Sequence, residues 1–497
     1  MINDYIKGVN SPSFFFVIII NSLCFFFPKS IFANEKPNIV LIIADDLGWN
    51  DLGCYGNSIV ATPNIDRIAK GGLKFTNAYL TTSSCSPSRA SIITGRYPHN
   101  TGFPEFTFNG GIADELPVLP ELLKKAGYYT AQAGKWHLDN VVFDSINKDD
   151  IGPGGESNWV TTLKNRPKNK PFFMWFASTD PHRKWGANQF RGSNNPDNIT
   201  PPPFLANTAE TRQDLAKYYD EITRFDFYVG EVEKELQRQG VLNNTVIIII
   251  SDNGRAFPRC KTRLYDSGIK TPLIIKWVDG IDSVGIESSS MVSVIDIAPT
   301  LLDIADGNIP KSFQGKSFKT LLNKPQLNFR TYIFAEHNWH GFETHERMVR
   351  TNSFMYIINR RPSLSNPPPM DAIKSPSFDD LIRLKGKGQL TDAQADIFIT
   401  PRPYEELFNC IDDPYQIANV ASLPEYKEVL SSLRNIMIEW QQDTHDTTPE
   451  NLTPDWVDRE TGELLDLINN EPGEHLEHRG ENPGGPRALT ITSGGPF

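Results

Sequence analysis

The chain has little cysteine and no excess of basic residues. Its 497 residues include five cysteines, too few and too scattered for a disulfide framework, although one disulfide stays possible without an indicated pair. Lys and Arg together number 49 against 60 Asp and Glu, so the formal net charge is −11. A surface of that sign repels nucleic acid and acidic membranes, and we expect no nucleic-acid partner. An anionic ligand must therefore be held by a local basic pocket.

The chain also lacks an apolar run long enough for a convincing membrane span near its start. The stretch at 14–27 is short and is interrupted by Asn21. It precedes a possible cleavage site at Ala33, so we expect residues 1–33 to be a secretory signal and the protein to be periplasmic or secreted. A membrane anchor is the alternative. Lipoprotein attachment at Cys24 is less favoured, because a leucine precedes that cysteine.

What is present is ordinary globular composition, with 39% hydrophobic and 22% charged residues. Short β-branched or aromatic runs alternate with amphipathic segments, which predicts an α/β fold with helices on both faces of a mainly parallel sheet. The predicted buried parallel strands are 38–43, 127–133, 171–178, 245–250 and 271–277, and the main predicted helices are 62–72, 86–95, 119–127, 209–240 and 293–306.

The pattern of predicted secondary structure changes near residue 346. Short strand-like pieces, a proline-rich turn region and one more predicted helix at 424–444 follow one another from there. We therefore expect a large α/β domain over 34–345 and a smaller α+β domain over 346–460. Residues 461–497 are rich in Gly, Pro, Glu and Asn, which predicts an irregular tail.

Polar residues follow four of the predicted strands. Ligands of open α/β sheets bind outside the carboxyl ends of the strands, so these residues should share one edge. They are Asp45 and Asp46, Lys135 and His137, His182, and Asp252 and Asn253. The aspartates and the asparagine offer hard oxygen ligands, which suit Ca²⁺ or Mg²⁺. Either pair alone, Asp45-Asp46 or Asp252-Asn253, could simply be residues that favour a turn. Two such pairs after two buried strands favour a metal site.

The lysine and the histidines at this edge could supply cationic contacts and proton transfer to a leaving group. Cys85 comes at the start of the helix predicted at 86–95, where unpaired backbone N–H groups favour an anion. The alternative for an isolated cysteine is simple packing as a small apolar residue.

The segment around this cysteine resembles the signature of type I sulfatases, C-x-P-S-R followed by T-G. Here the signature is Cys85-Ser86-Pro87-Ser88-Arg89 with Thr94-Gly95. The family's other landmarks occur in order: "ADDLGWNDLGCYG" and "TPNIDRIA" before it, then "GKWHL", "DPH" and "SDNG". The resemblance covers about residues 37–445, and within the family the chain looks most like the N-sulfoglucosamine sulfohydrolase branch and bacterial polysaccharide sulfatases.

This resemblance implies an alkaline-phosphatase-like catalytic domain over 34–345 and a role for each matching residue. Cys85 would be oxidised by a formylglycine-generating or sulfatase-maturating enzyme to 3-oxoalanine (Cα-formylglycine), the nucleophile, which also touches one Ca²⁺ ion. The implied calcium ligands are Asp45, Asp46, Asp252 and Asn253. Arg89 would hold the hydrated formylglycine, and Lys135, His137, His182 and Lys261 would bind the sulfate oxygens, with His182 or Lys135 protonating the leaving group. The implied reaction is in-line attack at sulfur, a covalent sulfo-enzyme and release by elimination.

The negative net charge favours a pocket for one terminal sulfated sugar over a groove for a long polyanion, so we expect exo action on a polysaccharide-derived oligosaccharide such as one from ulvan or a glycosaminoglycan. Arg183, His345 and Arg347 are candidate substrate-binding residues, although they could instead form interdomain salt bridges. Rival functions are a phosphodiester or phosphonate monoester hydrolase, an aryl or choline sulfatase, and a non-catalytic glycan-binding protein. The oligomeric state and the choice between N-sulfate and O-sulfate are open at this point.

Overall fold

The computed structural model describes residues 36–104, 111–138, 142–147, 155–186, 189–450, 452–465 and 489–497. The secretory signal expected at 1–33 lies outside these residues, as does much of the tail expected at 461–497. The described part of that tail has no helix or strand beyond an isolated bridge between Val457 and Leu464. Within the described residues, no helix is both long and apolar enough to cross a membrane.

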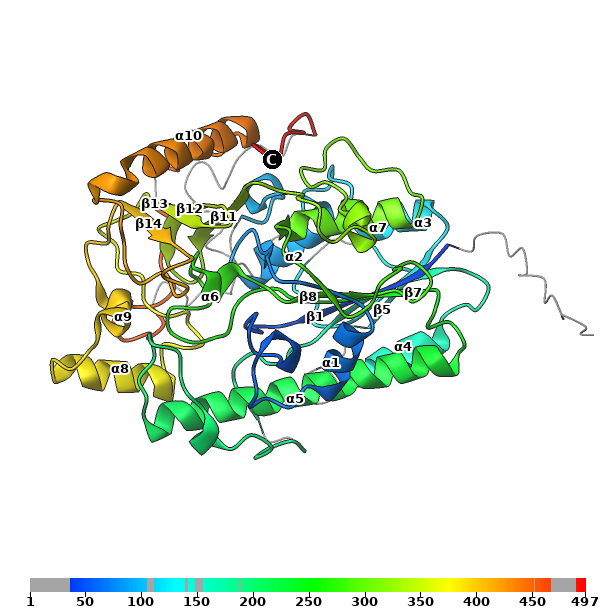
Figure 1. Cartoon of the computed structure of the whole chain (residues 1–497), viewed down its shortest axis with the longest axis horizontal. Helices are drawn as coiled ribbons and strands as arrows, with labels where there is room; N and C mark the ends of the chain where they lie inside the picture. Colours follow the sequence, from blue (N-terminus) through cyan, green and yellow to red (C-terminus); the bar gives the residue numbers. More distant parts are fainter. Residues whose placement is uncertain are drawn as a thin grey trace, which may run out of the picture. The chain divides into compact units, whose positions relative to one another are not determined.

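An eight-stranded sheet lies at the centre of the unit that begins at Lys36 (Figure 1). In spatial order its strands are β5 (Ser145–Asn147), β4 (Tyr129–Gly134), β6 (Phe172–Ala177), β1 (Asn38–Ala44), β7 (Thr245–Ser251), β8 (Leu273–Lys276), β2 (Leu73–Phe75) and β9 (Ile286–Ser288). The central strand β1 pairs in parallel with β6 and β7, and all three are completely buried. Burial on both faces explains why their sequences are unbroken apolar runs. The mainly parallel sheet predicted from the sequence is confirmed.

One predicted parallel strand runs the other way. β8 pairs antiparallel with β7, in the register Ile248 to Ile275. Between these two strands the chain has only the four-residue helix α6 (Asp266–Ile269), not a full crossover helix, and a parallel return needs a crossover of a dozen residues or more across one face. Residues 252–272 instead stay at the end of the sheet, where they build the site described below.

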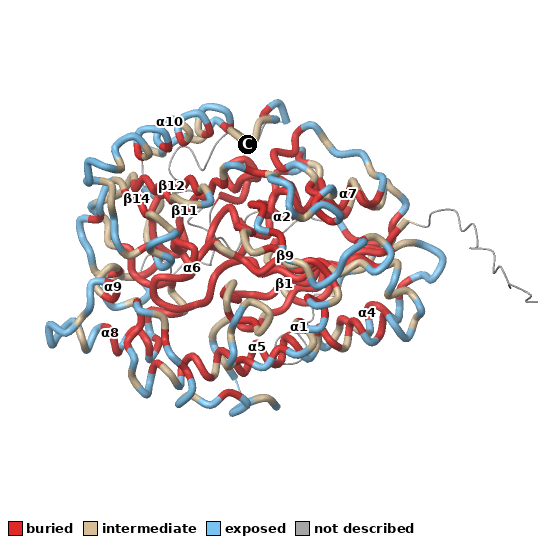
Figure 2. The backbone as a smooth tube through the Cα atoms, in the orientation of Figure 1, coloured by how far each residue is buried: buried red, intermediate tan, exposed pale blue. Residues whose placement is uncertain are grey.

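Helices cover both faces of the sheet, as the sequence predicted. Alternate residues of β1 point to opposite faces: Ile39 and Leu41 join one apolar core and Val40 and Ile42 the other. One face carries α1 (Pro63–Lys70), α4 (Trp159–Asn165) and the long α5 (Ala209–Arg238), and the other carries α2 (Cys85–Thr94), α3 (Leu119–Lys125) and α7 (Ile297–Ile304) (Figure 1). Figure 2 shows the sheet as a continuous buried layer between helices whose outer sides are exposed.

A second, antiparallel sheet follows in the C-terminal part. It contains β11 (Ile333–Trp339), β12 (Glu343–Arg350), β13 (Phe354–Asn359) and β14 (Glu405–Asn409), in that order. The long helix α10 (Lys427–Thr444) packs on it through Leu433, Met437 and Trp440. Between β13 and β14 the chain forms α8 (Pro376–Gly386) and α9 (Asp392–Ala395). The sheet starts at Ile333, so residue 345, where we expected the larger domain to end, lies inside β12.

Candidate active site at the carboxyl ends of the central strands

The acidic residues expected at the sheet edge meet there. Asp45 and Asp46 follow β1 directly, and Asp252 and Asn253 follow its neighbour β7. The backbone N–H of Asp46 donates to Oδ1 of Asp252 at 3.2 Å, and the Asn253 amide donates to Oδ1 of Asp46. All four side chains are fully buried. Two adjacent parallel strands therefore place three carboxylates and one amide in one small volume, as the strand pattern predicted.

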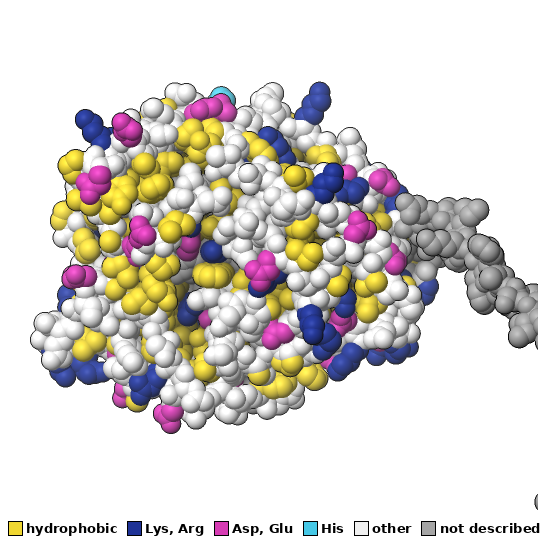
Figure 3. All heavy atoms as spheres, viewed as in Figure 1, with side chains coloured by type: hydrophobic (Ala, Val, Ile, Leu, Met, Phe, Trp, Pro, Cys, Tyr) yellow, Lys and Arg dark blue, Asp and Glu magenta, His cyan; other side chains and the backbone are white. Residues whose placement is uncertain are grey.

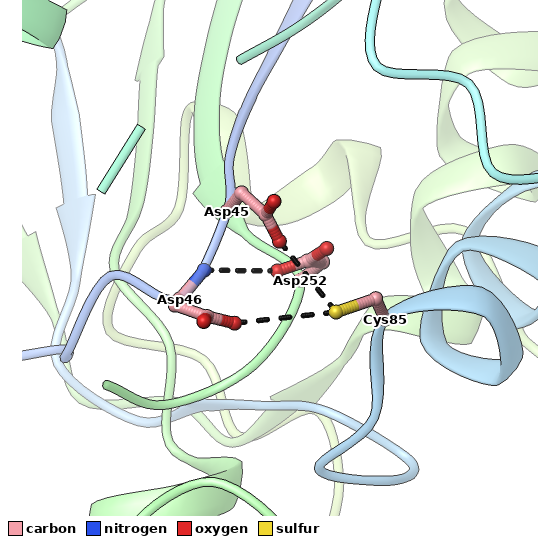
Figure 4. Close-up of side chains that lie close together, drawn as sticks. All are labelled: Asp45, Asp46, Cys85 and Asp252. Carbon is pink, nitrogen blue, oxygen red and sulfur yellow. Dashed lines mark hydrogen bonds between the residues drawn. The ribbon is translucent and has the colours of Figure 1, made fainter. Parts of the chain in front are cut away.

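Cys85 points into this acidic cluster from the first residue of α2 (Figure 4). Its Sγ lies 3.5 Å from Oδ1 of Asp45 and 4.0 Å from Oδ1 of Asp46. The helix begins after Ser84 in extended backbone and ends at Gly95, whose φ of 64° suits a residue without a Cβ. One possible ligand atom from each of Asp45, Asp46, Cys85 and Asp252 lies within 4.8 Å of the others. The placement of Cys85 at a helix N-terminus is thus as predicted.

Three cations surround the cluster. Arg89, on the next turn of α2, donates from Nε to Oδ2 of Asp252 at 2.8 Å and from its guanidinium to the carbonyl oxygen of Lys135 at 3.1 Å. The Lys135 ammonium, just after β4, lies 2.5 Å from Oδ2 of Asp45. Lys261, in the loop after β7, donates to Oδ2 of Asp46 at 3.0 Å. The structure therefore brings all three predicted cations to one site.

Burial and charge act on these carboxyl groups in opposite directions. Burial opposes ionisation of Asp45, but Lys135, His182 and Arg89 together hold the pKa of Asp45 well below its usual range. For Asp252, burial outweighs the attraction of Arg89 and raises the pKa to about 6. Asp45 is therefore ionised, whereas Asp252 is harder to ionise than an exposed aspartate, because burial opposes its charge more than Arg89 favours it.

Both predicted histidines belong to this site. His182 Nε2 lies 3.8 Å from Oδ2 of Asp46, and its side chain is 29% exposed, more than those of the three cations. His137 is half-buried, and its pKa is well below 6.5 because of desolvation and the positive charges of Lys135 and Arg89. His137 is thus a neutral imidazole, and both histidines are partly accessible to solvent.

Two residues of the C-terminal part complete the site, and sequence reasoning missed both. Asp371 accepts a hydrogen bond from the Lys261 ammonium at 2.9 Å and lies 3.3 Å from Nε2 of His182. His340, in the turn between β11 and β12, hydrogen-bonds through Nδ1 with Oγ of Ser84 at 2.8 Å, directly before Cys85. His340 lies a few residues before the candidates His345 and Arg347 in the sequence, but no local signal marks Asp371, which follows a proline-rich turn.

The three candidate substrate-binding residues have other partners. Arg183 is bidentate to Asp214 of α5 and stacks on Trp185, with its guanidinium 3.9 Å from the ring centre. Arg347 on β12 is bidentate to Asp446, beyond the end of α10. His345 is buried near the same pair, and burial followed by Arg347 lowers its pKa well below 6.5. The structure does not gather these three residues around Cys85.

Comparison with known proteins fits this geometry. The family model described as "Sulfatase" matches residues 37–149 and 157–307, which include every residue of the acidic cluster and the three cations. The chain belongs to the sulfatase family. It is accordingly a sulfuric ester hydrolase. A second model, the C-terminal part of N-sulphoglucosamine sulphohydrolase, matches residues 259–360 of this sulfatase.

Similar sulfatases act on sulfated carbohydrates, as their names state. An ulvan-active sulfatase of Formosa agariphila is 32% identical over 460 residues, which cover 82% of this chain and 75% of that protein. The human N-sulphoglucosamine sulphohydrolase is 30% identical over 466 residues, covering 84% and 92%. A protein solved in complex with its substrate D-glucosamine-2-N,6-O-disulfate has the same fold, with a TM-score of 0.64 at 22% identity over 82% of this chain and 98% of that one.

Proposed function

We propose that this sulfatase removes sulfate from a terminal sugar of a sulfated carbohydrate, using a formylglycine made from Cys85 and one calcium ion. The observation that carries the proposal is the buried group of four hard ligand residues around Cys85, with Arg89, Lys135 and Lys261 beside it. The names of the similar proteins, which state ulvan and glucosamine sulfates as substrates, support a carbohydrate.

The residues around Cys85 fit a calcium ion. Asn253 Oδ1 is buried and has no hydrogen-bond partner among the described residues, so an amide oxygen is left for a cation. The three carboxylates add hard oxygen ligands, which Ca²⁺ prefers over soft ones. The raised pKa of Asp252 reflects burial and the nearby negative charge of Asp45, which a bound cation would relieve. When bound, the ion would neutralise the carboxylates and polarise a sulfate oxygen.

A modified Cys85 suits this position better than a thiol. Burial raises the pKa of the unmodified thiol well above 9, and Asp252 and Asp45 add to that effect, so the side chain would stay a neutral and weak nucleophile. The hydrate of a formylglycine carries two hydroxyls, one to attack sulfur and one whose deprotonation releases the sulfate. Maturation to formylglycine requires a separate modifying enzyme, which we count among the partners of this protein.

The chain's own cations would hold and balance the sulfate. Lys135 and Lys261 present ammonium groups to the cluster, and each can donate to a sulfate oxygen. Arg89 is fixed by Asp252 and by the Lys135 carbonyl, so it anchors the base of α2 beside residue 85. The His182 side chain is partly exposed, so its Nε2 can contact a bound substrate. We therefore assign His182 as the group that donates a proton to the departing oxygen or nitrogen.

The surface supports action on a chain end. Figure 3 shows basic side chains in small groups interspersed with acidic ones on the face in view. With a net charge of −11, such a surface would not hold a long polyanion along its length. We therefore propose exo action on oligosaccharides and, from the sequence of residues 1–33, export to the periplasm or beyond.

The test is a desulfation screen with oligosaccharides from ulvan, heparan sulfate, carrageenan and fucoidan, read by mass spectrometry and NMR. We expect loss of one sulfate from the terminal sugar of at least one of them, and no loss with a Cys85→Ala variant that folds normally. Hydrolysis of none of these sugars, or an aryl phosphodiester preferred over an aryl sulfate in parallel kinetics, would contradict the proposal. Release of sulfate from internal positions would contradict exo action alone.

A further inference from the structure

Asp371 brings a carboxylate from the C-terminal part of the chain to the sulfate-binding side of the site. It shares Lys261 with the metal-site residue Asp46, since the Lys261 ammonium is 2.9 Å from an oxygen of each. The same Oδ2 of Asp371 lies 3.3 Å from Nε2 of His182. The Asp371 side chain is 17% exposed, so a bound sugar can reach it.

The position of this carboxylate is fixed by its surroundings. The residues after it turn back, because the N–H groups of Ala372 and Ile373 both donate to the Pro369 carbonyl oxygen, at 2.8 and 3.0 Å. The neighbouring Met370 packs against Gly341, where an added Cβ would lie 2.2 Å from the Met370 sulfur. Gly341 follows His340, which is hydrogen-bonded to the residue before Cys85. Asp371 is therefore held at a defined place beside Lys261 and His182.

A carboxylate at this place does not serve sulfate binding. Sulfate oxygens need hydrogen-bond donors, whereas an ionised carboxylate only accepts and repels an anion. Burial works against its ionisation, but Lys261 and His182 hold the pKa of Asp371 well below its usual range, so the group is charged. Its Oδ1 is buried and has no hydrogen-bond partner among the described residues, so the exposed part of the side chain lies elsewhere than at Oδ1.

We propose that Asp371 is a specificity-determining residue that accepts a hydrogen bond from a hydroxyl or N–H next to the scissile sulfate and excludes a second anionic group there. The inference rests on the proposed function, because it needs a sugar as the leaving group. A site selects by repulsion as well as by attraction, and one fixed carboxylate supplies both. The substrate class is thus a terminal sugar whose ring position beside the scissile sulfate is free of sulfate.

The test compares two substrates that differ only at that neighbouring position. If glucosamine N-sulfate is hydrolysed, the pair is that sugar with and without a 3-O-sulfate; for an O-sulfated sugar it is the monosulfate and the vicinal disulfate. We expect the wild type to prefer the hydroxyl form by at least about tenfold in kcat/KM. Asp371→Asn should reduce that preference by about tenfold, through slower hydrolysis of the hydroxyl form and faster hydrolysis of the disulfate.

Two controls keep the result interpretable. Asp379→Asn makes the same chemical change at an exposed position on α8 and should leave the preference unchanged. The ratio of two kcat/KM values does not depend on the amount of folded enzyme, so partial misfolding of the variant cancels, and Asp371→Ser gives a second measurement. Binding of both sugars to Cys85→Ala and to Cys85→Ala/Asp371→Asn, measured by calorimetry, should show the same change in preference.

Two results would overturn the inference. If Asp371→Asn slows both sugars by the same factor or changes neither, Asp371 only supports Lys261 and His182. If the wild type prefers the vicinal disulfate, the carboxylate excludes nothing. Either result leaves the proposed function standing. A wild type that hydrolyses no sulfated sugar would instead contradict the proposed function and this role together.

Discussion

Arg347 allows a sharp test between a role in substrate binding and a role in stability. Its guanidinium donates to both oxygens of Asp446 at 2.7 Å, and the two side chains are 1% and 0% exposed. Arg347→Met leaves Asp446 buried without its partner, a change that costs about 3–5 kcal/mol. With an unfolding entropy of about 2.1 cal/mol/K per residue over roughly 460 residues, each kcal/mol lowers Tm by about 1 °C. The expected fall in Tm is therefore about 3–5 °C.

The assay pairs thermal unfolding with steady-state kinetics on the best substrate. We expect Arg347→Met to lower Tm while KM stays within about twofold of the wild type. Arg347→Met/Asp446→Leu should recover most of the loss, because replacing both members of a buried pair by apolar groups is often neutral. Arg434→Met removes an exposed bidentate partner of Glu405 and should shift Tm by less than about 1 °C. A tenfold rise in KM with an unchanged Tm would refute the structural role of Arg347.

Three further predictions concern the site and the stability of the protein. Enzyme made without a maturating enzyme should be nearly inert, and mass spectrometry of the peptide with residue 85 should show an aldehyde only in active enzyme; finding cysteine alone in fully active enzyme would contradict this. Asn253→Leu should weaken calcium binding at least about tenfold in calorimetric titration after chelation, since it removes one oxygen ligand; unchanged affinity would take Asn253 out of the ligand set. Burial, then Arg263 and Arg347, lowers the pKa of His337 to about 3. Below about pH 6.5 the unfolded chain therefore binds a proton that the folded chain does not. The free energy of unfolding consequently decreases as the pH is lowered. Between pH 7.5 and 5.0 His337→Gln should lose about 2 kcal/mol less than the wild type in urea denaturation, and equal losses would show that His337 titrates normally.

The local pattern of the sequence was sufficient to predict the centre of the site. β1 and β7 are unbroken apolar runs because both of their faces are buried, so the chain alone shows where each strand ends and which polar residues follow it. Parallel neighbours end at the same edge, and this puts Asp45 and Asp252 together without further information. The helix start at Cys85 is equally local, since Ser, Pro and Gly mark its ends.

Other parts of the site depend on contacts between distant segments, which no local pattern encodes. Asp371 meets Lys261 across 110 positions of the chain because the connection between β13 and α8 packs against the loop after β7. Arg183 and Arg347 carry guanidinium groups that could bind a sulfated ligand. In the structure, however, Arg183 forms an ion pair with Asp214, and Arg347 forms one with Asp446. The direction of β8 likewise depends on how residues 252–272 pack and not on the composition of the strand.

The sequence by itself thus determined the central strands, the helix that begins at Cys85 and the polar residues that follow the strands, because each follows from periodicity or from position at a strand end, whereas Arg89 and Lys261 were predicted from the resemblance to sulfatases. Only the tertiary structure decided which charged residues face one another. A buried charge needs a partner, and that partner can come from any point of the chain. For this reason Asp371, which no sequence motif marks, lies in the site and contacts Lys261. Arg347, by contrast, forms an ion pair with Asp446.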